Sequence, residues 1–217
     1  MVNTFQEIQR KLGLPPLRVY SQDPSGSEVD ISVLRPKGFT FLDDQVFGEL
    51  QQKCIRACHD VYIKLNDEKG MPGLLYVVRL EEPCKGLLWP IGGGMDAGLH
   101  PLKSLIKKTK GESGLDLNQE NILYLMHASA AIYSISPTDV RNSGGKGYNN
   151  RGCYSTSDVF YAEANEGSEI ALNHEHKNPS IITPKEYWES FRAEHAAKDP
   201  YLLDGSDLAM KALEMRI

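Results

Sequence analysis

The chain has few cysteines and no long apolar run, and these two absences exclude whole classes of protein. Four cysteines in 217 residues do not make a disulfide framework. The longest apolar stretches, such as residues 74–78, are too short to cross a bilayer. Residues 1–13 contain no apolar core of the kind that a secretory signal needs, so we expect a cytoplasmic protein without membrane contact.

Neither sign of charge is in large excess. The chain has 24 basic and 29 acidic residues, a formal net charge of −5, and this mild acidity argues against binding nucleic acid through bulk charge. A composition of 41% hydrophobic and 24% charged residues is typical of a globular protein that buries a substantial core. We therefore expect a small-molecule ligand and no nucleic acid.

The order of segments predicts a short arm followed by one α/β domain. Turn signals at residues 14–16 and 23–26 indicate a lightly structured N-terminal arm over residues 1–40, which could dock a partner or a second copy. Residues 41–217 form the predicted domain, and a homodimer stays open.

Hydrophobic periodicity within the domain predicts helices and strands in irregular alternation. Helices are expected from Asp43 through the apolar positions up to Cys58, after the capping box of residues 183–186, and from Ser206 or Asp207. A short helix is also expected over residues 101–110, stopped by Gly111 or Gly114. Strands are expected at residues 61–66, 74–80, 86–89, 122–135 and 154–164. This order favours a mixed β-sheet covered by helices on both faces.

The most informative segment combines a strand, glycines, a short helix and a second glycine turn. Its first part reads Trp-Pro-Ile-Gly-Gly-Gly-Met-Asp-Ala-Gly over residues 89–98, and its last part reads Gly-Glu-Ser-Gly-Leu over residues 111–115. Glycines in such a unit allow backbone N–H groups to approach a ligand or the facing helix.

This unit resembles the Nudix box, whose pattern is G-x5-E-x7-R-E-U-x-E-E-x-G-U, where U is a bulky apolar residue. The box aligns without a gap over residues 93–115, from Gly93 to Gly114 and Leu115. Asp96 falls where many members have an acid, and Pro101 falls at a helix start. The resemblance implies a Nudix-like α/β/α sandwich over roughly residues 55–200.

Most of the chemistry that the resemblance implies is missing. Leu99, Lys108 and Gly111 occupy three glutamate positions of the box, and Lys107 occupies its arginine position. Only Glu112 is retained. Nudix carboxylates hold Mg²⁺ or Mn²⁺, which neutralises the diphosphate and activates a water. A lysine ammonium supplies no oxygen ligand and would repel a dication about 5 Å away by several kcal/mol.

The leading hypothesis is a Nudix-like protein that binds a nucleotide or nucleoside-diphosphate derivative, with weak or absent hydrolase activity. Its pocket is expected between the 92–98 loop, the 101–110 helix and the 141–152 loop. Glu112 is the candidate catalytic residue and, with Asp96, the candidate ligand of Mg²⁺ or Mn²⁺. The candidate substrate-binding residues are Gly93, Gly94, Lys107, Lys108, Lys146 and Arg151.

Two alternatives stay open. The chain could be an active diphosphate hydrolase with a relocated metal site, made of Asp96, Glu112, Asp116 and Glu120. It could also be a non-catalytic interaction module, in which residues 1–40 dock a partner or a second copy. Separately, the lysines of the 101–110 helix could simply form a solvated face.

Other patterns are weaker. The 143–147 segment lacks the glycine and the hydroxyl of a Walker A loop, and Cys54 with Cys58 lacks the further ligands of a zinc site. The 174–176 segment, His-Glu-His, is expected in a surface loop, and a Cys153–His127 pair stays open. Trp89 is expected to pack in the core.

Overall fold

The computed structural model describes residues 4–15, 55–80, 85–97, 99–132, 153–165 and 167–216. Their strands form one seven-stranded mixed sheet in the order β3-β2-β1-β6-β5, with β4 paired to β1 and β7 paired to β2. Strands β1 and β6 are parallel, and the other pairs are antiparallel. The strands are β1 (Arg56–Asn66), β2 (Pro72–Arg79), β3 (Leu88–Trp89), β4 (Ile91–Gly94), β5 (Leu117–Ile132), β6 (Cys153–Ala164) and β7 (His176–Ile182).

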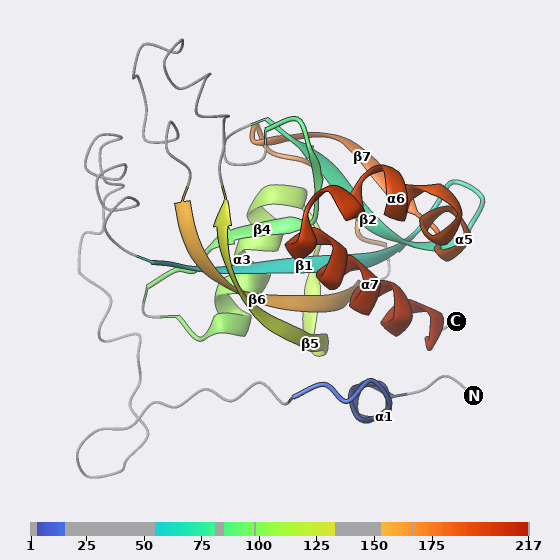
Figure 1. Ribbon diagram of the computed structural model, residues 1–217, viewed down its shortest axis with the longest axis horizontal. Helices are drawn as coiled ribbons and strands as arrows, with labels where there is room; N and C mark the ends of the chain where they lie inside the picture. Colours follow the sequence, from blue (N-terminus) through green and yellow to red (C-terminus); the bar gives the residue numbers. More distant parts are fainter. Residues whose placement is uncertain are drawn as a thin grey trace.

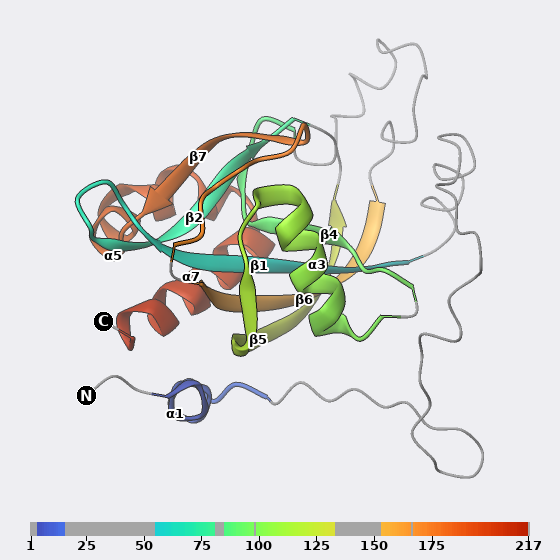
Figure 2. The same ribbon diagram turned by 180° about the vertical axis from the view of Figure 1, so that it is seen from behind.

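Helices cover both faces of this sheet, which confirms the predicted α/β/α layers. Helix α3 (Pro101–Ser113) lies on one face, and α7 (Pro200–Glu214) and α1 (Phe5–Lys11) lie on the other (Figures 1 and 2). Short turns link β7 to α7: α5 (Pro184–Glu186), the π-helical η3 (Tyr187–Phe191), α6 (Arg192–Glu194) and the 3-10 helix η4 (Ala196–Lys198). No described helix is long and apolar enough to span a membrane.

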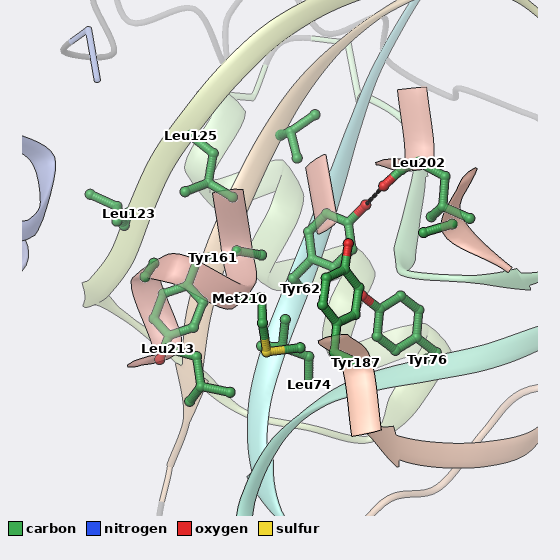
Figure 3. Close-up of a cluster of buried hydrophobic side chains, with 14 of the residues drawn as sticks. Tyr62, Leu74, Tyr76, Leu123, Leu125, Tyr161, Tyr187, Leu202, Met210 and Leu213 are labelled. Atoms are coloured by element: carbon green, nitrogen blue, oxygen red, sulfur yellow. Dashed lines mark hydrogen bonds between the residues drawn. The ribbon is translucent and has the colours of Figure 1, made fainter. Parts of the chain in front are cut away.

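The core is divided by the sheet because strand side chains alternate between its faces. Val61 and Ile63 of β1 pack toward α3, whereas Tyr62 packs toward α7. On the α7 side, buried tyrosines bring hydroxyl groups into the core (Figure 3). Tyr62 donates to the Leu202 carbonyl at 3.4 Å, and Tyr76 donates to Ser206 Oγ at 3.0 Å. These bonds satisfy hydroxyls that would otherwise be costly to bury.

Of the two glycines expected to end the helix after residue 101, Gly114 does so, whereas the start of α7 differs from the prediction. Helix α3 continues through Gly111 to Ser113 and ends at Gly114, whose φ of 72° is the left-handed conformation that glycine adopts easily. Helix α7 begins at Pro200 and not at residue 206 or 207, because Asp199 accepts a hydrogen bond from Leu202 N–H and caps it earlier. The capping box at Thr183 is confirmed.

The helix predicted from Asp43 is wrong where the structure describes it. Ala57 and Cys58 belong to β1, where they pair with β6 and, for Cys58, with β4 as well. Pairing on both edges of a strand overrides a local pattern that is compatible with a helix. Residues 43–54 lie outside the described residues. Strand β7 is a further element that the sequence analysis does not predict.

The first part of the predicted arm contains helix α1. Thr4 and Glu7 form a reciprocal capping box, in which each side chain bonds the other residue's backbone N–H. Ile8 is fully buried in the core on the α7 side. The predicted division at residue 40 lies outside the described residues.

Candidate functional site

Strand register brings four chemically important positions into one row beneath α3. Gly93 of β4 pairs with His59 of β1, His59 lies beside Asp158 of β6, and Asp158 pairs with His127 of β5. Strand alternation places the side chains of His59 and Asp158 on the α3 face, like Val61 next along β1. His127 Nδ1 lies 2.8 Å from Asp158 Oδ1. The row links the beginning of the box to the edge of the sheet.

The glycines of the box lie in strand β4 and not in a turn. A Cβ on Gly92 would be 2.3 Å from the His59 carbonyl oxygen, so only glycine fits there. Gly93 has a φ of 150°, and a Cβ on it would be 2.8 Å from Cε of Lys108. A Cβ on Gly94 would be 2.6 Å from the Arg56 guanidinium. The glycines therefore permit close packing of β1 and of two basic side chains against β4.

Lys108 and Glu112 form an ion pair one turn apart on α3. Lys108 Nζ lies 2.7 Å from Glu112 Oε1, and the two side chains are 28% and 5% exposed. Neither carboxylate oxygen of Glu112 has a regularly aligned hydrogen-bond donor among the described residues, so the contact is mainly one of charge. Burial raises the pKa of Glu112, and the Lys108 ammonium opposes that rise.

Arg79 and His176 occupy paired positions of β2 and β7, and the Arg79 charge acts on Glu112 while the Lys108 charge acts on His176. His176 Nδ1 lies 3.1 Å from Asn173 Oδ1, and its Nε2 has no hydrogen-bond partner among the described residues. Burial, assisted by the Arg79 charge, lowers the pKa of His176 to about 4. The Asn173 N–H also bonds the Glu112 carbonyl at 2.9 Å, which attaches this segment to the end of α3.

His59 is held beneath the start of α3 by Ser104. Ser104 Oγ lies 2.9 Å from His59 Nε2 and accepts a hydrogen bond from the Asp96 N–H at 2.8 Å. Burial lowers the pKa of His59 to about 4, and the nearby Lys108 charge adds to this. His59 is therefore a neutral imidazole at pH 7, and its Nε2 can accept a hydrogen bond from the Ser104 hydroxyl group. The contact joins β1, α3 and the loop after β4.

Lys107 and Lys110 of α3 have carboxylate partners on the surface. Lys107 Nζ donates to Asp96 Oδ2 at 2.5 Å, and Lys110 Nζ donates to Asp116 Oδ2 at 2.7 Å. Asp96 and Glu112, the two predicted metal ligands, are thus each paired with a different lysine. Lys146 and Arg151 lie outside the described residues, as does the whole 141–152 loop of the expected pocket.

A divalent cation does not fit the residues of α3. Leu99, Lys108 and Gly111 provide no side-chain oxygen ligand, and Glu112 is already paired with an ammonium. Within the described ranges, no group of three or more His, Cys, Asp or Glu residues is placed to hold a metal ion. The assignment of Glu112 and Asp96 as metal ligands stays a prediction.

Several weaker sequence predictions can now be compared with the structure. Trp89 is 3% exposed and stacks on Tyr201, as expected for a core residue. His176 begins strand β7 and is buried, so the surface-loop interpretation of that segment is wrong at this residue. In the β5–β6 pairing, Cys153 lies opposite Ile132 and Asp158 lies opposite His127. Five strand residues, roughly 17 Å, therefore separate Cys153 from His127 along the sheet.

Sequence reasoning missed Arg79 and the Ser104–His59 contact, and it placed His176 in a surface loop. No local signal marks them, because Arg79 and His176 meet only through the pairing of β2 with β7. The one available hint is that both lie at strand ends next to polar segments.

The fold can be compared with that of known proteins. No protein-family model matches the chain, and no curated protein matches it. Among solved structures, the chain matches a MutT/nudix family protein from Enterococcus faecalis at 14% identity and a TM-score of 0.45. The match covers 66% of this chain and 57% of the Enterococcus protein, so the chain spans little more than half of that protein's length.

Two further solved structures are covered almost completely. A C. elegans Ap4A hydrolase in a binary complex matches at 17% identity and a TM-score of 0.46, over 70% of this chain and 96% of that chain. The NUDIX domain of Shewanella oneidensis NrtR, crystallised with ADP ribose, matches at 12% identity and a TM-score of 0.49, over 77% and 97%.

Proposed function

We propose that this chain is a Nudix-fold protein that binds a nucleotide or another nucleoside-diphosphate derivative and has weak or no hydrolase activity. The observation that carries the proposal is the Lys108–Glu112 ion pair. Lys108 occupies a glutamate position of the box and packs against Gly93, the first residue of the box.

The ion pair supports this proposal through its charge. The last box carboxylate, Glu112, is buried and is neutralised by an ammonium of the same helix. An incoming dication would have to displace that ammonium and would find one carboxylate where the box normally offers several. The Lys108 side chain thus supplies locally the positive charge that a metal would otherwise bring.

Retention of an anionic ligand is supported by the cations around the site. Lys108 adjoins Gly93, and Arg79 lies close enough to Glu112 and His176 for its charge to affect the pKa of both. Arg79 Nε has no hydrogen-bond acceptor among the described residues. Guanidinium and ammonium groups are the usual protein partners of phosphate oxygens.

The first experiment separates binding from cleavage. The pure protein is incubated with ADP-ribose, dinucleoside polyphosphates, NADH, nucleotide sugars and dNTPs, with Mg²⁺, with Mn²⁺ or with EDTA, and the products are separated by chromatography. We expect no metal-dependent cleavage, together with a ligand that raises the melting temperature in EDTA. Rapid metal-dependent turnover of one compound would contradict the reduced activity, and no thermal shift with any compound would contradict the binding.

A second experiment rebuilds the box. The triple variant Leu99→Glu, Lys108→Glu and Gly111→Glu restores the missing glutamates beside Glu112. We expect Mn²⁺ to stabilise this variant and to leave the natural chain unchanged. The matched control replaces Lys108→Glu by Lys107→Glu, at the arginine position of the box. Equal stabilisation of both triple variants would show that Lys108 does not occupy the metal position.

A further inference from the structure

Helix α1 is attached to the domain by two hydrophobic anchors. Ile8 is fully buried in the core on the α7 side. Phe5 packs edge-on against Tyr161 with ring centroids 6.1 Å apart, and the Arg216 guanidinium lies 4.8 Å from the centre of the Phe5 ring. In both overall views α1 lies next to β5 and the C-terminal end of α7, and its contacts with β5 agree with this position (Figures 1 and 2).

The slot that receives Phe5 is organised by residues outside α1. Arg216 Nε donates to Glu163 Oε1 at 2.7 Å, and Arg216 Nη2 donates to Glu163 Oε2 at 2.9 Å. This two-point contact fixes the plane of the guanidinium, and Glu163 is itself next to Lys64 Nζ at 3.6 Å. The wall formed by Tyr161 and Arg216 therefore belongs to β6 and the end of α7, independently of what occupies the slot.

Helix α1 depends on this surface for its structure. It has seven residues, whereas isolated helices below about 12 residues are marginal in water. Its apolar residues Phe5, Ile8 and Leu12 recur at helical spacing and all pack against the same core. This is the helix-in-groove mode of recognition, in which a short segment orders as it binds.

The connection between α1 and the domain is long. Residues 16–54 separate the α1 segment from the start of the described domain at residue 55. The effective concentration of a tethered segment at its site falls roughly as the −3/2 power of tether length, once the tether is longer than the span it must cross. The same segment of another molecule therefore competes with it at high protein concentration.

We propose that the surface around Tyr161 and Arg216 is an exchangeable docking site for an amphipathic helix, and that residues 4–14 of a second copy of this chain bind it in trans. Phe5 fills the aromatic slot and Ile8 enters the core, as they do within one molecule. The exchange produces a homodimer in which each copy supplies its N-terminal helix to the other.

The binding test uses the full chain carrying Ile8→Asp, whose own helix cannot dock, and a fluorescent peptide of residues 1–15. We expect the peptide to bind this variant at least tenfold more tightly than it binds the natural chain, whose site is occupied. A peptide with Phe5→Ala and Ile8→Asp is the control and should not bind. Adding Arg216→Ala to the Ile8→Asp chain should weaken binding. Equal binding to both chains, or no binding to a folded Ile8→Asp chain, overturns the proposal.

If the Ile8→Asp chain does not melt cooperatively, a full chain with a protease site inserted between residues 16 and 54 replaces it. After cleavage, an excess of labelled peptide should displace the N-terminal fragment, and failure to displace it overturns the proposal. Sedimentation from micromolar to near-millimolar concentration then tests the second copy. We expect a concentration-dependent dimer that is absent in a chain carrying both Phe5→Ala and Ile8→Asp, whose helix docks in neither arrangement. A natural chain that stays monomeric throughout refutes exchange between copies.

Discussion

Replacing Lys108 by methionine removes the ammonium beside Glu112 while keeping most of the aliphatic contact with Gly93. The carboxylate is then buried without a cation, with its side chain 5% exposed. The folded variant must either keep a charged carboxylate buried, which is costly, or protonate Glu112. The free energy of protonation therefore sets an upper limit on the stability that is lost. From an ordinary carboxyl pKa of 4.5, protonation at pH 7 costs about 3.4 kcal/mol, at 1.36 kcal/mol per pH unit. The electrostatic loss should therefore not exceed about 3.4 kcal/mol at pH 7.

The pH dependence of the loss tests the reasoning more sharply than its size. Burial already raises the pKa of Glu112 in the natural chain, and removing Lys108 raises it further. A carboxyl with a raised folded pKa stabilises the protein at low pH, and this contribution is lost as pH rises from 4.5 through the folded value. The deficit of Lys108→Met relative to the natural chain should therefore shrink, by up to about 1.4 kcal/mol per pH unit, between pH 7 and 5.

Urea denaturation of both chains at pH 7, 6 and 5 measures this deficit. Lys107→Met is the matched control, because its ion pair with Asp96 is exposed and should be worth at most about 1 kcal/mol. In a Glu112→Gln background, Lys108→Met should have a small effect that does not vary with pH. A Lys108→Met deficit that is constant from pH 7 to 5 would refute the proposed role of Glu112.

Three further predictions follow from the structure. The folded pKa of His59 lies below its ordinary value, so the free energy of unfolding should fall as pH decreases from 6.5 through about 4. His59→Asn should reduce that fall by up to about 3 kcal/mol, measured by urea denaturation at pH 7 and 4.5. Gly92→Ala should cost several kcal/mol of stability, because the added Cβ would lie 2.3 Å from the His59 carbonyl oxygen. Gly111→Ala adds its Cβ in open space on α3 and should stabilise the protein by about 0.5–1 kcal/mol. A thermal melt that ranks the two variants the other way would contradict the packing. Tyr201→Phe removes a hydrogen bond to the buried Asp60 carboxylate and should cost about 1–3 kcal/mol at pH 7, a loss that should diminish on acidification as Asp60 protonates.

Local sequence determined the box unit and the type of several elements. Proline at the first position of α3 and glycine after its end act through backbone geometry, so they indicate the helix without knowledge of its surroundings. The same holds for the capping box at Thr183, for the alternating apolar residues over 61–66 in β1, and for the continuous apolar run over 74–78 in β2. The absence of most box carboxylates is also a property of sequence alone, and it directed attention to Lys108 and Glu112.

Only tertiary structure decided where β1 begins, that β7 exists, and which charged groups meet. Ala57 and Cys58 are extended because β6, and for Cys58 also β4, hydrogen-bond to them, and those partners are distant in sequence. Register likewise placed His59 beside Asp158, and β7 brought His176 next to Arg79. Sequence spacing shows that Lys108 and Glu112 are neighbours on a helix, but not that the pair is buried. Burial makes the charge balance of this pair important for stability, because a carboxylate without a cationic partner is costly to bury.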